Sequence, residues 1–422
     1  MKKTINFLAA VLFVIPASGV LKASDFEKSV KSVEADLALI KINPKLQSPD
    51  RIQPSMAPKW WSMMGSAHSA ITKAALDFID KTEFPDIGRA KDVLITGGND
   101  ETGHSSRVAN GGRPEDLWRG KKPETKGGVL YNYEQFISSA AYERLGTICH
   151  LTQDMAVPTH AANIRHSIGD SFEGWYSYDN KVKITASRDG GEMEPYAYYQ
   201  QVQDETRRHL AEWVNPATGR PYWVPADNAP PLGQDVTFGP WGHYGGERNT
   251  DHYAAPAPTS PGTEGNSNNN QWVTASPEIR FRQLAVAGAA TVSVFKSASK
   301  RLPPLVKNLS VGAAAARHAI KFGAFDNRSR SLEYAVLVYK DGALIGSAVK
   351  GKAPLAAPPA GEIMLSGEVS VEWDGTVNSV PLPAGSYVLE VRLTDGDGNT
   401  TPDEVNADSN PANNTRTALT IN

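Results

Sequence analysis

The sequence predicts a mainly α fold, in which a helical domain is followed by a C-terminal β-sandwich domain. Between residues 60 and 304, apolar residues recur in several segments at the spacing of helices. After Pro303-Pro304 the pattern changes to strict alternation, and about seven short strands follow, as in a β-sandwich. A chain of 422 residues is also too long for one ordinary hydrophobic core, so more than one domain is expected.

The first residues have the pattern of a secretory signal peptide, which we predict over residues 1–23. Met1-Lys2-Lys3 is positively charged, and the apolar run Phe7–Ile15 follows it. This run is too short to cross a bilayer as a permanent span. We therefore expect the protein to be secreted or periplasmic.

Residues 24–59 are charged and then rich in proline, and we interpret them as a pro-segment or linker. The helical domain is predicted over 60–304. It begins with Trp60-Trp61 and a first helix, whose periodic positions are His68, Ile71, Ala75, Leu76 and Ile79. A loop of glycine-rich composition then supplies a carboxylate and an imidazole, Asp100 and His104, which together suit a metal ion.

The stretch from Tyr142 to Trp175 contains three of the nine histidines, with carboxylates between them. His150 and Asp154 are four residues apart in a segment of helical periodicity, so both side chains lie on one helix face. Pro158 ends that helix, and further candidate ligands follow at His160, His166, Asp170 and Glu173. Zinc is bound by histidine nitrogens and carboxylate oxygens without any cysteine, so the stretch predicts a zinc site.

The remainder of the helical domain contains two more predicted helices around an irregular insertion. Gln200–Val214 has an amphipathic pattern, and residues 278–302 form a long segment with a wide apolar face. Between them, residues 215–275 are rich in Pro, Gly and Asn, which is typical of a surface insertion.

Residues 305–422 are predicted to form the β-sandwich. Two alternating runs meet at Lys340-Asp341-Gly342, which is a hairpin signal. The later run LPAGSYVLEVRLTDGDGN resembles immunoglobulin-like or fibronectin-like modules. Its oxygen-bearing residues Asp395, Asp397 and Asn399 are of the kind that bind calcium, although such a run is also typical of a turn.

Charge and cysteine content exclude some classes of protein. The net charge of −3 and the pI near 6.3 give no basic field for phosphate-driven nucleic-acid binding. Cys149 is the one cysteine of the chain, so no intramolecular disulfide forms.

The run HLTQDMAVPTH, residues 150–160, resembles the His-x-x-x-Asp-x-x-x-Pro-x-His motif of zinc-dependent bacterial phospholipases C and of the related single-strand-specific nucleases. The other candidate ligands occur in the order found in that superfamily, and the resemblance extends from Trp60 to Leu302. It implies a helical domain with three zinc ions along a cleft.

The resemblance also implies which residues hold each ion. One zinc is expected to bind Asp100, His104, His150 and Asp154, and Asp100 also orients or deprotonates the attacking water. A second is expected to bind His160, His166 and either Asp170 or Glu173. The spacing from His166 favours Asp170, and the run Phe172-Glu173-Gly174-Trp175 favours Glu173. The third is expected to bind His68, Asp154 as a bridge, and the terminal amino group of Trp60 or Trp61 after removal of the preceding segment.

These implications predict a secreted zinc-dependent phosphodiester hydrolase. Phospholipase C is favoured, because phospholipases of this superfamily carry a β-sandwich after the helical domain and the related nucleases generally lack one. Its partners would be a phospholipid substrate and a membrane surface contacted peripherally. The alternatives are a single-strand-specific nuclease of the same fold and a secreted binding protein whose zinc is structural.

Overall fold

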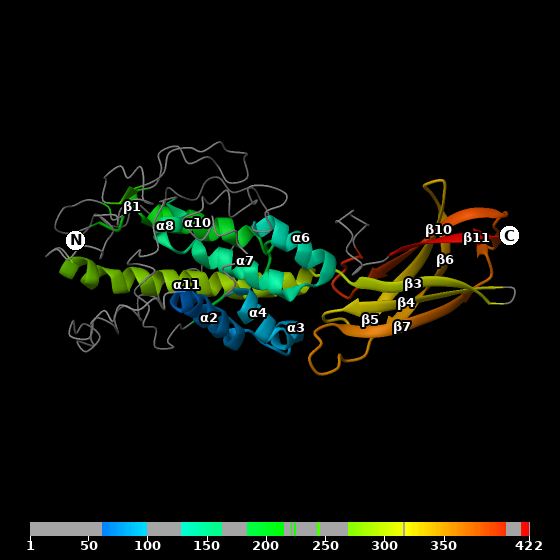
Figure 1. The fold of residues 1–422 in the computed structure, drawn as a ribbon, viewed down its shortest axis with the longest axis horizontal. Helices are drawn as coiled ribbons and strands as arrows, with labels where there is room; N and C mark the ends of the chain where they lie inside the picture. The colour runs from blue at the N-terminus through cyan, green and yellow to red at the C-terminus, as the bar shows by residue number, and fades with distance from the viewer. Residues whose placement is uncertain are drawn as a thin grey trace, which may run out of the picture. The chain divides into compact units, whose positions relative to one another are not determined.

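A computed structural model describes residues 61–98, 128–162, 184–214, 221, 223–224, 243–244, 269–314, 317–401 and 415–421 of the chain (Figure 1). These residues belong to the unit Arg51–Asn422, and the predicted signal peptide and pro-segment lie outside them. The helices are α2 (Trp61–Phe78), α3 (Pro85–Arg89), α4 (Lys91–Gly98), α6 (Val129–Ser139), α7 (Tyr142–Asp154), α8 (Pro158–Ala161), α10 (Ala197–His209) and α11 (Asn269–Arg301).

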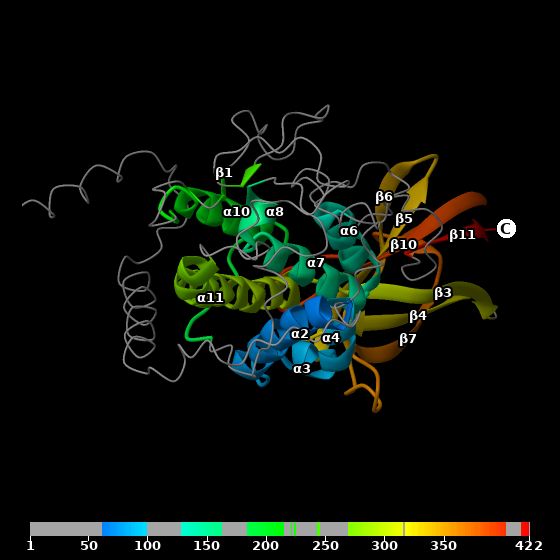
Figure 2. The same cartoon turned by 60° about the vertical axis from the view of Figure 1, so that its left-hand side comes forward.

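Helix α7 is the centre of the helical part. It contacts α2, α4, α6, α10 and α11, and both ribbon views show it among these helices (Figures 1 and 2). Every residue from Leu145 to Asp154 is buried. The apolar members of this run join the helical core, whereas His150, Thr152, Gln153 and Asp154 are polar and buried together. A buried polar group needs a partner, so the last turn of α7 must meet polar groups from neighbouring helices.

Helices α4 and α7 cross at glycines that allow their backbones to touch. A Cβ atom on Gly97 would lie 2.3 Å from the Glu143 carbonyl oxygen, and one on Gly146 would lie 2.7 Å from the Leu94 carbonyl oxygen. Only glycine permits this approach, because these neighbours are backbone atoms that cannot turn aside. The crossing brings the end of α4, at Gly98, against the last turns of α7.

The C-terminal part is a pair of antiparallel sheets, which Figure 2 shows as two layers. One sheet has the order β11-β10-β5-β6 and the other β3-β4-β7, with a small β8-β9 ribbon beside them. Inward side chains of β5, β10 and β4 form one shared core, for example Val336, Leu389 and Phe322. The strands are β3 (Leu305–Ala314), β4 (Arg317–Asp326), β5 (Ser331–Lys340), β6 (Ala343–Pro354), β7 (Leu365–Trp373), β8 (Thr376–Val377), β9 (Val380–Pro381), β10 (Gly385–Thr394) and β11 (Arg416–Ile421).

The predicted hairpin between β5 and β6 is confirmed. Lys340 pairs with Ala343, and the two residues between them have positive φ, 50° at Asp341 and 80° at Gly342. Two successive positive φ values are the geometry of a type I′ turn, whose twist matches that of the flanking strands.

A buried carboxylate joins the helical part to the turn that follows β4. Asp86 of α3 has no exposed surface, and its oxygens accept hydrogen bonds from Tyr142 (2.8 Å), Ser299 (2.6 Å) and Asn327 (3.1 Å). Burial, and then the Asp86 charge, raise the pKa of Tyr142 well above its usual range, so its hydroxyl stays protonated and donates. Arg89 adds hydrogen bonds to the carbonyl oxygens of Asn327 and Ile363.

The prediction of a mainly α fold is wrong. The structure is mixed, with 39% of the residues that it describes in helix and 33% in strand. Much of residues 60–304 has loop composition, whereas most of the described residues after 304 lie in strands, so strand makes up a larger share than the length of the helical domain suggests. Even the predicted insertion contains a short ribbon, β1 (Trp223–Val224) paired with β2 (His243–Tyr244).

The structure also bears on two local predictions, the start of the last helix and the calcium candidate. The last helix of the helical part, α11, begins at Asn269, nine residues before the predicted start at 278. At the calcium candidate, Asp395 uses its side-chain oxygens to accept hydrogen bonds from the backbone of Asp397 and from Asn399, as in a tight turn. Among the described residues, no helix has both the length and the apolar character needed for a membrane span.

Candidate metal centre

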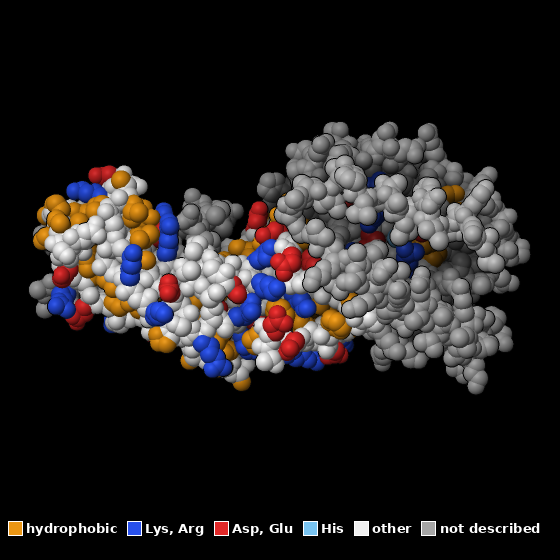
Figure 3. All heavy atoms as spheres, turned by 180° about the vertical axis from the view of Figure 1, so that it is seen from behind, with side chains coloured by type: hydrophobic (Ala, Val, Ile, Leu, Met, Phe, Trp, Pro, Cys, Tyr) orange, Lys and Arg blue, Asp and Glu red, His pale blue; other side chains and the backbone are white. Residues whose placement is uncertain are grey.

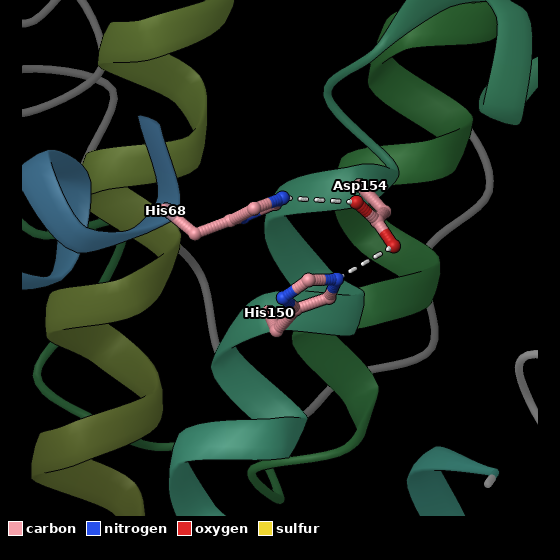
Figure 4. A group of neighbouring side chains, drawn as sticks. All are labelled: His68, His150 and Asp154. Atoms are coloured by element: carbon pink, nitrogen blue, oxygen red, sulfur yellow. Dashed lines mark ion pairs between the residues drawn. The ribbon is translucent and has the colours of Figure 1, made fainter. Parts of the chain in front are cut away.

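Three predicted ligands meet where α2 crosses the end of α7. His68 comes from α2, and His150 and Asp154 come from successive turns of α7 (Figure 4). One ligand atom from each residue lies within 4.8 Å of the other two, and all three residues are buried. A buried group of two imidazoles and a carboxylate can hold a metal ion.

The Asp154 carboxylate lies between the two imidazoles. Its Oδ1 atom is 3.4 Å from His68 Nε2, and its Oδ2 atom is 3.5 Å from His150 Nε2. The rings themselves are stacked, with centroids 3.9 Å apart. Each carboxylate oxygen therefore faces a different histidine, which is the arrangement of a carboxylate that can bridge two ions or cap one.

The nitrogen–oxygen distances fit metal ligands better than they fit strong hydrogen bonds. A charge-assisted N–H···O bond has a length of roughly 2.7–2.9 Å. Two ligand atoms of a tetrahedral zinc, each about 2.1 Å from the ion, are roughly 3.4 Å apart. The separations of 3.4 and 3.5 Å match the second value.

Both histidines are fixed through their other ring nitrogen. His150 Nδ1 lies 2.8 Å from the carbonyl oxygen of Gly98, and His68 Nδ1 lies 2.7 Å from Oε1 of Gln153. A hydrogen bond at Nδ1 orients the ring and turns Nε2 toward the ligand position, which is the usual arrangement around metal-bound histidines. The glycine crossing of α4 and α7 supplies the Gly98 carbonyl group.

The electrostatics of the centre keep Asp154 ionised. Burial by itself raises the pKa of the carboxyl, but the neighbouring imidazoles of His150, His160 and His68 outweigh burial and hold the pKa well below its usual range. An ionised carboxylate is the form that binds a cation. His160, on α8, thus lies close enough to act on Asp154, although it is not part of the three-residue group.

The other predicted ligands are distributed as follows. His160 is buried on α8, which starts with Pro158 at its first turn, where proline fits a helix. Trp61 begins α2, and nothing further is described of its side chain. Outside the described residues lie Trp60, Asp100, His104, His166, Asp170 and Glu173.

Gln153 and the Gly98 carbonyl group belong to the centre but were not predicted from the sequence. Gln153 had a signal, because the consecutive polar residues Thr152, Gln153 and Asp154 point in different directions around the helix and cannot all lie on one solvent-facing side. Gly98 had no such signal, because every residue type has a backbone carbonyl group and the sequence does not indicate which one contacts a histidine.

Comparison of the chain with protein-family models, with curated proteins and with solved structures found no match.

Proposed function

We propose that this protein is a zinc-dependent phosphodiester hydrolase of the phospholipase C type. The observation that carries the proposal is the Asp154 carboxylate, with one oxygen facing His68 and the other facing His150. The resemblance implied this pairing in advance, because it gave His68 and His150 to two different zinc ions that share Asp154. The order of the candidate ligands in the sequence supports the same reading.

The full complement is three zinc ions. Asp154 with His150 would serve one ion together with Asp100 and His104, and Asp154 with His68 would serve another together with the amino group of Trp60 or Trp61. His160, His166 and Asp170 or Glu173 would serve the last. When bound, zinc supplies a Lewis acid that offsets the charge of a phosphodiester and makes water more acidic.

The residues of the chain have separate tasks in this proposal. His68 and His150 hold their Nε2 atoms toward Asp154, each fixed through Nδ1. Asp100 accepts a proton from the attacking water. The side chains of His68 and Asp154 keep 10% and 11% of their surface exposed, and His150 keeps 2%, so the reacting phosphate would approach from the side of His68 and Asp154.

Surface properties favour a lipid substrate over a nucleic acid. Positive and negative side chains are interspersed on the described part of the face drawn in Figure 3, and the formal net charge is −3. A groove for single-stranded nucleic acid needs clustered positive charge beside stacking aromatic rings. The strands also expose large apolar side chains, with Leu344 56% and Val380 64% exposed, which suits contact with a lipid interface.

The test compares two substrates with and without metal. We expect the zinc-loaded protein to release phosphorylated headgroup from phosphatidylcholine micelles at a rate exceeding its degradation of single-stranded DNA by about an order of magnitude or more. Chelation should abolish both activities, and added zinc should restore them. His150→Ala should lose zinc and hydrolysis together, since it removes a direct ligand.

A matched control is His318→Ala, which removes a histidine that packs against Trp373 on the β part. It should keep zinc and activity. Degradation of DNA without headgroup release from any common phospholipid would replace the lipase by a nuclease. If the protein retains zinc and hydrolyses neither substrate, the zinc has a structural role and the proposed hydrolase function is wrong.

A further inference from the structure

His150 is held in one tautomer by the backbone. Its Nδ1 atom lies 2.8 Å from the carbonyl oxygen of Gly98, and a carbonyl oxygen can only accept. Nδ1 therefore carries the proton and donates it. In the neutral ring this leaves Nε2 with a lone pair, directed toward Asp154 Oδ2.

The tautomer of His68 depends on a side-chain amide instead. Its Nδ1 atom contacts Oε1 of Gln153 at 2.7 Å. An amide can turn over and exchange its oxygen for its nitrogen, so this contact alone does not decide which atom faces the ring. The orientation of the Gln153 amide is therefore decided by the residue that contacts its other polar atom.

Thr291 on α11 fixes that other end. Its hydroxyl donates its single proton to the carbonyl oxygen of Ala287 at 2.8 Å. The same hydroxyl lies 3.1 Å from Gln153, and it can only accept there because its proton is already used. The Gln153 atom facing Thr291 is therefore the amide nitrogen, and the amide oxygen faces His68.

Thr72 contacts the same amide nitrogen without fixing its direction. Its hydroxyl lies 3.2 Å from Gln153 Nε2 and is not held by a second hydrogen bond among the described contacts. A hydroxyl in that position can rotate to donate or to accept. Thr72 and Thr291 are both fully buried, so they differ mainly in this one respect.

We infer that Gln153 is a positioning residue, which Thr291 orients so that His68 donates from Nδ1 and presents the lone pair of Nε2 beside Asp154. The use of this orientation in holding zinc rests on the proposed function. The hydrogen-bond relay itself, from Ala287 through Thr291 and Gln153 to His68, is supported by these contacts alone. Gln153 is 2% exposed, so water does not compete strongly for its amide. The relay ties the ligand on α2 to α7 and α11 at once.

The experiment reads the tautomer of His68 directly in the metal-free full chain, by long-range proton–nitrogen-15 NMR at mildly alkaline pH, where imidazole is mainly neutral. Zinc affinity is measured in parallel by competition with a chelator. We expect His68 to be protonated at Nδ1 in the unmodified protein. Thr72→Val should keep this tautomer, whereas Thr291→Val should mix the two tautomers and weaken zinc binding by roughly 10–100-fold.

Two substitutions at Gln153 complete the set. Gln153→Glu keeps an acceptor opposite His68 and should keep the Nδ1–H tautomer, whereas Gln153→Leu removes the acceptor and should lose it. Circular dichroism identifies any variant that has not folded, and the comparison of the two threonines remains if both Gln153 variants fail. A His68 ring protonated at Nε2 in the unmodified protein, or equal effects of Thr72→Val and Thr291→Val, would overturn the inference. If the tautomers behave as expected and no zinc binds, the positioning role stands and the proposed zinc function fails.

Discussion

The Asp154 carboxylate and the two imidazoles beside it form a group of electron-rich atoms that ordinary packing does not explain. Neutral histidines whose Nδ1 atoms already donate have only lone pairs to offer a carboxylate, and such a contact is unfavourable. Either protons on Nε2 or a cation among the three residues removes the conflict. The nitrogen–oxygen separations of 3.4 and 3.5 Å favour the cation.

The sequence predicts part of this centre. His150 and Asp154 are separated by one helical turn, so their shared face follows from local geometry. His68 is brought in by tertiary packing from a helix about 80 residues earlier (for His150 and His68 the spacing itself carries no information). Its inclusion came from the family resemblance, and its partner Gln153 was not anticipated.

A second buried carboxylate, Asp326, gives a prediction about pH. Burial raises its pKa to about 7, and its Oδ2 atom has no hydrogen-bond partner among the described residues. The unfolded chain titrates this group near 4, so between about pH 4 and pH 7 the folded protein binds more protons than the unfolded one. The free energy of unfolding therefore decreases as the pH rises through that range.

Asp326→Asn removes this dependence, because an amide does not ionise, and its oxygen can still accept from the backbone of Arg328 and Ser329. We expect the variant to be more stable than the unmodified protein above pH 7, by an amount on the order of a few kcal/mol, and to lose the gain toward pH 4. Urea unfolding of both proteins at the two ends of the range measures it. Asp77→Asn, at an exposed position on α2, is the control. An equal gain at both ends would show that the charge is not the cause.

At the scale of elements, most of the described helices and strands can be predicted from the spacing of apolar residues and from the residues that end helices or form turns. Apolar periodicity predicts α2, α7 and α10, and Pro158 separates α7 from α8. Alternation and the Asp341-Gly342 pair predict β5, β6 and the turn between them. The early start of α11 was missed, because Pro277 falls inside the helix and proline usually marks a boundary.

The glycine crossing of α4 and α7 gives a prediction at this scale. A Cβ atom on Gly146 would lie 2.7 Å from the Leu94 carbonyl oxygen and 2.9 Å from the Gly98 nitrogen, so α4 would have to move away. Because the Gly98 carbonyl group holds His150, we expect Gly146→Ala to weaken zinc binding as well as to lower stability by about 1–3 kcal/mol.

Gly88→Ala is the matched control, since an added Cβ atom there first meets the flexible side chain of Lys81 at 3.3 Å. Thermal melts and chelator competition of both variants give the comparison. Unchanged zinc affinity in a folded Gly146→Ala protein would mean that the crossing does not position His150.

At the scale of the whole molecule, buried hydrogen bonds join the helical part to the strands. The sequence predicts a change of pattern after Pro304, but it gives no sign that Asp86 would be buried against Asn327, more than 200 residues later. Such contacts form only when complete helices and strands pack together, so local sequence patterns do not indicate them. They tie α3, α7 and α11 to the turn that follows β4.

We therefore predict that Asn327→Ala destabilises the helical part as well as the strands. It removes the donor to Asp86 (3.1 Å) and to the Ser299 carbonyl oxygen (2.7 Å), and it leaves both acceptors buried. The expected loss is on the order of 2–4 kcal/mol in the free energy of unfolding, measured by urea denaturation followed by circular dichroism. Arg317→Ala breaks an exposed ion pair with Glu372 and should change stability little. Strand signals that unfold early while helical signals keep their midpoint would show two independent parts.

The central claim is that a metal ion binds where His68, His150 and Asp154 meet. It is tested most directly by crystals grown with zinc, from which anomalous difference maps are recorded above and below the zinc absorption edge. We expect a zinc peak about 2.0–2.2 Å from Nε2 of His68 or His150 and from an oxygen of Asp154. A map with no anomalous peak at this group, and with the histidines hydrogen-bonded directly to Asp154, would contradict it.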